Sequence, residues 1–99
     1  MTAQTTQPAS LPWLEKLIAI PTVSGTSNLE LIELIETEFA RYGYSGVRTY
    51  NEDGTRANLL VTVPAADGTT RGGVILSGHT DVVPVAGQAW DADPFTLRV

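Results

Sequence analysis

Cysteine is absent from the 99 residues, and histidine occurs once, as His79. Without cysteine the chain can form neither a disulfide nor a thiolate metal site, so any metal must be bound by histidine, aspartate or glutamate. Basic residues are also few, with 6 Lys and Arg against 11 Asp and Glu and a net charge of −5. Because nucleic acids and anionic membranes are bound by clustered basic side chains, neither is expected as a partner.

Long apolar runs are missing as well. No stretch approaches the ~20 apolar residues that span a membrane. Residues 1–10 lack the basic start and the apolar run of a signal peptide. We therefore expect a cytoplasmic protein. The composition, 42% hydrophobic and 17% charged, is typical of a folded globular domain, because disordered chains carry less apolar surface and more charge.

The first helix is predicted over residues 10–20, after a disordered tail at residues 1–9. Ser10 is the expected N-cap. Pro21 ends the helix, because the residue before a proline is pushed out of the helical region.

A second helix is predicted over residues 27–43. Ser27 and Glu30 fit a capping box at its start, and Gly43 is well placed to end it. The expected apolar stripe consists of Leu31, Leu34, Ile35, Phe39 and Tyr42, while Glu33 and Glu36 are expected to face solvent.

Three strands should follow, at residues 47–50, 58–63 and 74–77, with a turn at residues 51–54 between the first two. The third is too apolar to alternate, which favours a central strand covered on both faces. The predicted class is α/β, a mixed sheet flanked by helices in the order α-α-β-β-β. Residues 96–99 read as the start of a further strand, so we expect the chain to be the front part of a longer polypeptide.

His79 and Asp81 are the candidate functional residues. In extended backbone, side chains two positions apart point the same way, so both can face one site while Thr80 points elsewhere. A carboxylate on one ring nitrogen fixes which nitrogen is free to bind a metal. On spacing and position alone, the simpler interpretation is that the pair is structural, because zinc sites take three or four protein ligands and no second histidine is present.

Other polar and aromatic residues near the histidine have simpler interpretations. Asp91 and Asp93 are expected to form turns in the Asp-Pro segment. Trp90 and Phe95 are expected to be packing residues and not substrate contacts.

The run Ser-Gly-His-Thr-Asp-Val-Val-Pro at residues 77–84, with Gly-Gln-Ala-Trp at 87–90 and Asp-Pro-Phe at 93–95, resembles the co-catalytic zinc aminoacylase/carboxypeptidase family. Segments 20–24, 27–29 and 57–59 are similar to the start of such enzymes. The resemblance covers nearly the whole chain from about residue 11 onward.

This resemblance implies a function and a partial site. His79 matches a histidine that binds one of two zinc ions, with cobalt as a substitute metal, and Asp81 matches the carboxylate of the catalytic site that orients this histidine. Residues 10–99 would be the amino-terminal portion of a zinc-peptidase-like catalytic domain. The bridging Asp, the general-base Glu and the other ligands would lie beyond Val99.

The implied reaction is hydrolysis of an N-acylated amino acid, with N-acetyl-L-ornithine favoured and with ornithine and acetate as products, in arginine biosynthesis. The full-length protein would be a homodimer, and the 99 residues alone would be inactive. Sister reactions remain open, namely those of a succinyl-diaminopimelate desuccinylase, an aminoacylase or a dipeptidase. A non-catalytic remnant module that keeps the motif only for packing remains open too.

Overall fold

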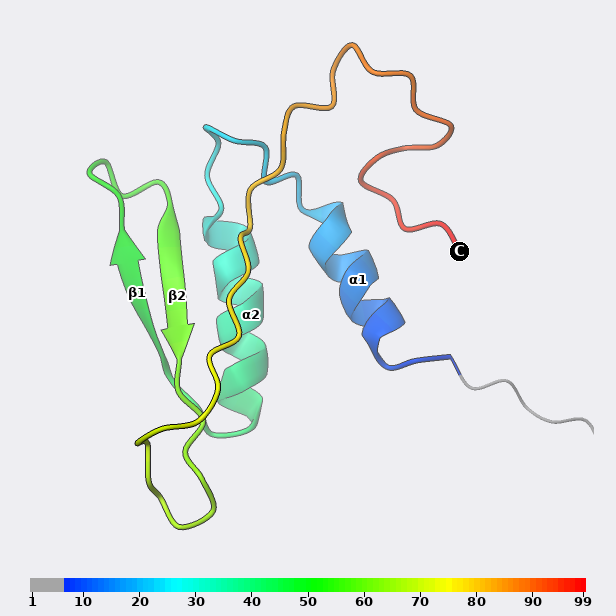
Figure 1. Cartoon of the computed structure of the whole chain (residues 1–99). Coiled ribbons are helices and arrows are strands. Elements are labelled where there is room, and N and C mark those ends of the chain that lie inside the picture. The colour runs from blue at the N-terminus through cyan, green and yellow to red at the C-terminus, as the bar shows by residue number, and fades with distance from the viewer. Residues whose placement is uncertain (1–6) are drawn as a thin grey trace, which may run out of the picture. The chain divides into compact units, whose positions relative to one another are not determined.

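The computed structural model describes residues 7–99 (Figure 1). Its regular elements are two helices followed by two strands: α1 (Ser10–Ala19), α2 (Leu29–Arg41), β1 (Gly46–Tyr50) and β2 (Ala57–Val61). None of the helices in these residues is long and apolar enough to cross a membrane. The α/β class is thus confirmed, with two strands where three had been predicted.

The chain divides into two compact units. One comprises Met1–Pro21 with Pro84–Val99, and the other comprises Thr22–Val83. The first contains α1, and the second contains α2, β1 and β2. Most of the tail expected at residues 1–9 lies outside the described residues.

Helix α1 includes Ser10, which the sequence had predicted to be the N-cap residue just before the helix. Ala9 is the N-cap, with helical angles of φ −60° and ψ −18°, and no side chain caps this end. The Leu11 N–H is instead bound by the Pro8 carbonyl at 3.1 Å. The prediction of Ser10 as the cap is therefore wrong. The predicted end is confirmed, since Ile20 before the proline is extended at φ −93° and ψ 111°.

The capping box predicted at the start of α2 is not formed. Ser27 accepts a hydrogen bond from the N–H of Leu29 at 3.2 Å, and not from Glu30 as a capping box requires. Asn28 takes the N-cap position, but its side chain makes no capping bond. The Asn28 amide is bound to other segments of the chain, as described below.

Gly43 closes α2 as predicted. With φ at +86° it adopts the left-handed conformation that suits glycine. Its N–H binds the Ala40 carbonyl at 3.0 Å, and the N–H of Tyr44 binds the Phe39 carbonyl at 3.1 Å. These two bonds form a Schellman motif, which satisfies carbonyl groups that the end of the helix would otherwise leave open.

The small core lies where α2 contacts β2. Ile32 and Leu31 are buried, with 2% and 5% of their surface exposed, and Ala57 of β2 is buried at 4%. Ile32 was not in the predicted stripe. Tyr42 was, but it is 67% exposed. The reason is that α2 ends at Arg41 and Tyr42 has left the helical conformation, with ψ at 5°.

Strands β1 and β2 form an antiparallel hairpin, in register from Gly46 opposite Val61 to Tyr50 opposite Ala57. Both predicted strands are confirmed with shifted ends, since β2 stops at Val61. The expected turn at residues 51–54 joins them. Asn51 stabilises this turn, because its side-chain carbonyl accepts the N–H of Arg56 at 2.9 Å.

The strand predicted at residues 74–77 is wrong. Val74, Ile75 and Leu76 are 85%, 89% and 93% exposed, and this segment belongs to no strand. A strand needs a partner for its backbone hydrogen bonds, and neither edge of the hairpin pairs with this segment. Residues 96–99 are also not a strand, for the same reason. The described sheet is therefore two-stranded and antiparallel, not mixed.

Candidate functional site

His79 and Asp81 contact each other as the sequence predicted. His79 Nδ1 lies 2.8 Å from the backbone oxygen of Asp81 and 3.1 Å from its Oδ1. Both oxygens are acceptors, so this geometry places a proton on Nδ1 and leaves the lone pair on Nε2. The His79 side chain is 84% exposed. Its Nε2 has no hydrogen-bond partner within residues 7–99, so it is available to a ligand.

Asp81 is held from its other side by Ser24. The Ser24 hydroxyl donates to Asp81 Oδ2 at 2.9 Å. This hydrogen bond is the main reason that the pKa of Asp81 lies below its ordinary value; partial desolvation opposes it, and the contact with His79 adds to the lowering. The Asp81 carboxylate is therefore anionic at neutral pH. Ser24 was not predicted as a residue of this site.

A short stretch of parallel pairing brings Ser24 to Asp81. Val23 and Val82 form a parallel bridge. The Ser24 N–H binds the Val82 carbonyl at 2.8 Å, and the Val82 N–H binds the Thr22 carbonyl at 2.9 Å. The loop before α2 thus serves as the backbone partner of the segment that carries the histidine.

Thr80 is held by two hydrogen bonds, one to its backbone carbonyl and one to its side chain. The buried Thr22 donates its hydroxyl proton to the Thr80 carbonyl. The buried Asn28 donates from Nδ2 to Thr80 Oγ1 at 3.0 Å. The Thr80 hydroxyl thus binds Asn28, whereas His79 binds Asp81. The two hydrogen bonds to Thr80 also fix the backbone on which His79 and Asp81 are carried.

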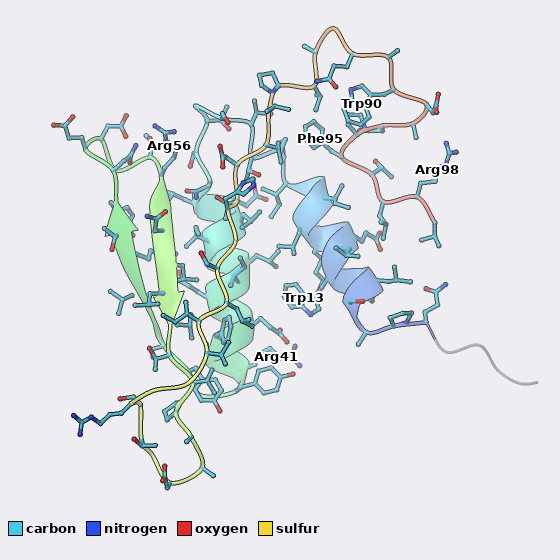
Figure 2. The ribbon with its side chains drawn as sticks, in the orientation of Figure 1. Trp13, Arg41, Arg56, Trp90, Phe95 and Arg98 are labelled. Atoms are coloured by element: carbon cyan, nitrogen blue, oxygen red, sulfur yellow. The ribbon has the colours of Figure 1, made fainter. Side chains whose placement is uncertain are left out.

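An open cleft of about 330 Å³ adjoins this site. Asp81 and Thr80 line it together with the loop at residues 22–26 and the end of the hairpin. Arg56, labelled in Figure 2 at the turn of the hairpin, supplies a cation to its wall. His79 itself is not one of the lining residues. The cleft and the exposed imidazole therefore meet at Asp81.

Within residues 7–99, no group of three or more His, Asp or Glu side chains could hold a metal ion. His79 alone fits one ligand position, because its Nε2 is exposed and its Nδ1 is already bound to a carboxylate. His79 could therefore serve as one metal ligand, with the Asp81 carboxylate in contact with its other ring nitrogen. The described residues 7–99 do not form a complete metal site.

The other candidates lie in the unit that contains α1. Asp93 is a turn former as predicted, since its Oδ1 accepts the N–H of Phe95 at 2.9 Å. The Trp90 indole N–H binds the Val85 carbonyl at 3.1 Å, and the side chain is half exposed. Phe95 is partly buried. Trp90 thus stabilises its own loop and is only partly the packing residue that we expected.

Comparison with known proteins shows similarity to curated enzymes, among them the following one. Acetylornithine deacetylase from Shigella sonnei (strain Ss046) is 39% identical to the chain over 89 residues, which cover 82% of this chain and 22% of that enzyme. The chain thus spans about a fifth of the length of this curated relative. No protein-family model matches the chain. No solved structure matches it either.

Proposed function

We propose that this chain is part of a zinc-dependent amide hydrolase of the co-catalytic aminoacylase/carboxypeptidase family, with N-acetyl-L-ornithine as the favoured substrate. The observation that carries the proposal is the contact between His79 and Asp81, which leaves Nε2 exposed. It occurs in a chain that is 39% identical to an acetylornithine deacetylase. We further propose that residues 10–99 form the amino-terminal portion of a zinc-peptidase-like catalytic domain.

The contribution of this chain to the reaction follows from the two residues. Bound zinc supplies a water of lowered pKa and polarises the amide carbonyl. His79 provides one ligand through Nε2. Asp81 keeps the proton on Nδ1 and makes the imidazole a more basic ligand. The exposed position of the imidazole gives a substrate room to approach.

The remaining parts of the site are proposed to come from outside these 99 residues. A catalytic zinc takes three protein ligands besides water, and no group of three such residues occurs within residues 7–99. The second zinc, the bridging Asp and the general-base Glu are therefore assigned to the rest of a longer catalytic domain. A homodimer and a cytoplasmic location belong to the same proposal. The 99-residue chain alone is accordingly proposed to be inactive and to bind zinc weakly.

A substrate panel tests the proposal on the complete product of the gene. Release of the amine product is measured for N-acetyl-L-ornithine, N-succinyl-diaminopimelate, other N-acylated amino acids and dipeptides. We expect N-acetyl-L-ornithine to give the highest kcat/KM. Activity should be lost on dialysis against a chelator and restored by Zn²⁺. His79→Ala should lower kcat/KM by at least about a hundredfold. Mutation of a residue that only orients a zinc ligand already lowers metal affinity or activity by about 10- to 100-fold.

Two outcomes would contradict the proposal. One is that no substrate of the panel is hydrolysed in the presence of zinc, which would favour the non-catalytic module. The other is robust zinc-dependent release of acetate by the 99-residue chain alone. A preference for another substrate of the panel would keep the reaction class but replace N-acetyl-L-ornithine by that substrate.

A further inference from the structure

We infer that Ser24 is a positioning residue of this site: its hydroxyl fixes the Asp81 carboxylate so that His79 carries its proton on Nδ1 and presents an unprotonated Nε2. The role of this nitrogen as a zinc ligand rests on the proposed function. The effect of Ser24 on the imidazole does not, because it follows from contacts within the chain.

The two carboxylate oxygens of Asp81 contact different residues. Oδ1 faces His79 Nδ1 at 3.1 Å, and Oδ2 accepts the Ser24 hydroxyl at 2.9 Å. The side chain is 63% exposed. Exposed carboxylates rotate freely into water unless something holds them, since ordering a side chain costs conformational entropy. Ser24 is the residue that holds this one from the side away from the histidine.

Ser24 is itself held firmly enough to do so. Its N–H binds the Val82 carbonyl at 2.8 Å, within the parallel bridge that joins the two segments. Its Oγ also lies 3.2 Å from the same carbonyl. A hydroxyl has one proton, and the nearer, charged carboxylate is the stronger acceptor. The hydroxyl therefore points at Asp81, from a backbone position that is already fixed.

The expected effect of losing Ser24 is partial. The Asp81 backbone oxygen, 2.8 Å from His79 Nδ1, would still accept a hydrogen bond from the Nδ1–H group. The contact that becomes loose is the one to Oδ1. A net hydrogen bond changes an equilibrium by roughly two- to tenfold. Ser24→Ala should therefore shift the ratio of the two imidazole tautomers by roughly two- to tenfold toward the form protonated on Nε2.

The ¹⁵N chemical shifts of the ring nitrogens measure this ratio directly. They are recorded on the 99-residue chain at a pH where the imidazole is neutral. His79 is the only histidine, so its signals need no further assignment. Ser27→Ala is the matched control, since this hydroxyl lies in the same loop but binds the N–H of Leu29. Ser24→Thr keeps the hydroxyl and should retain the tautomer ratio of the natural chain.

The outcomes separate the inference from its alternatives. An unchanged ratio in Ser24→Ala, or an equal shift in Ser27→Ala, would overturn it. The amide spectrum shows whether Ser24→Ala folds. If it does not, Ser24→Cys must show the change in tautomer ratio, because its thiol is similar in size to the hydroxyl but is a weak hydrogen-bond donor. No metal or activity is needed for this readout. If the protein proved not to be a zinc hydrolase, the inference about Ser24 would therefore still hold. If the tautomer ratio did not shift, the inference would be wrong whatever the activity of the protein.

Discussion

At the scale of single residues, Asn28 connects three parts of the unit formed by Thr22–Val83. Its Nδ2 donates to the Ala57 carbonyl at 2.9 Å and to Thr80 Oγ1 at 3.0 Å, and its Oδ1 accepts the Ala57 N–H at 2.9 Å. The amide imitates a backbone partner for the first residue of β2. It is 8% exposed, so water cannot easily replace these bonds.

Asn28→Ala should therefore destabilise the chain. The Ala57 N–H and carbonyl would remain buried without partners, which costs about 1–3 kcal/mol in the free energy of unfolding. Asn28→Asp should lose less, because it keeps the acceptor for the Ala57 N–H. Asn58→Ala is the control, since this neighbouring amide is exposed. Urea denaturation measures all three, and an Asn28→Ala variant as stable as the control would contradict this interpretation.

The residues of the site differ in how far the sequence could predict them. His79 and Asp81 are two positions apart, so the alternation of side chains in extended backbone was enough to bring them together. Ser24 and Asn28 reach the same segment across 57 and 52 residues of sequence. Local patterns carry no information about such distant pairs. An asparagine directly before a helix is typical of a cap, but the Asn28 side chain binds Ala57 and Thr80 instead.

At the scale of elements, an ion pair joins α2 to β1. The Arg48 guanidinium binds the Glu36 carboxylate through both Nε and Nη2. Both side chains are about three-quarters shielded from solvent. The hydrogen bonds from Arg48 lower the pKa of Glu36 below its ordinary value, with desolvation opposing them. Glu36 is thus not the solvent-facing residue that the helical pattern predicted.

This ion pair gives the stability of the chain a dependence on pH. The pKa of Glu36 is lower in the folded chain than in the unfolded chain, where it is about 4.3. The stabilisation is therefore complete above that value and is lost as the pH falls toward the folded pKa. In Glu36→Gln the free energy of unfolding should fall less steeply between about pH 5 and pH 3.

Glu33→Gln serves as the control, because Glu33 is exposed on the same helix and forms no ion pair within residues 7–99. Urea denaturation at a series of pH values gives the three slopes. Equal slopes for the natural chain and Glu36→Gln would show that the pair does not contribute.

The helices and the hairpin, which have local signals, were predicted well apart from the two N-caps, and the strand that needs a distant partner was not. The end of α2 at Gly43 and the hairpin with its polar turn could be predicted, because each depends on only a few adjacent residues. The segment at residues 74–77 has a strand composition, but a strand exists only where another strand pairs with it. Composition predicts the preference of a segment and not the presence of its partner.

At the scale of the whole molecule, little apolar surface is buried. Leu31, Ile32 and Ala57 are the buried apolar residues within residues 7–99. In contrast, Val74, Ile75 and Leu76 form an exposed apolar run. Since stability follows the apolar area removed from water, it should be concentrated in the contact of α2 with β2.

A pair of identical substitutions tests this distribution. Ile32→Val removes one methylene from a buried side chain and should cost about 0.5–1.5 kcal/mol in the free energy of unfolding. Ile75→Val makes the same change at an 89% exposed position and should change the stability by less than about 0.5 kcal/mol. Denaturant melts of both variants are compared directly. A similar loss in the two would mean that residue 75 is also buried.

The bridge between Val23 and Val82 also has a consequence for the order of folding. Thr22 and Thr80, which flank it, are 58 residues apart, whereas the hairpin closes across only a few. The loss of chain entropy makes closing the loop between Thr22 and Thr80 about 2 kcal/mol more costly in free energy than closing the hairpin. Helix and hairpin should form first, and the segments that carry Ser24 and His79 should meet last. The imidazole would then acquire its orientation only in the final step of folding.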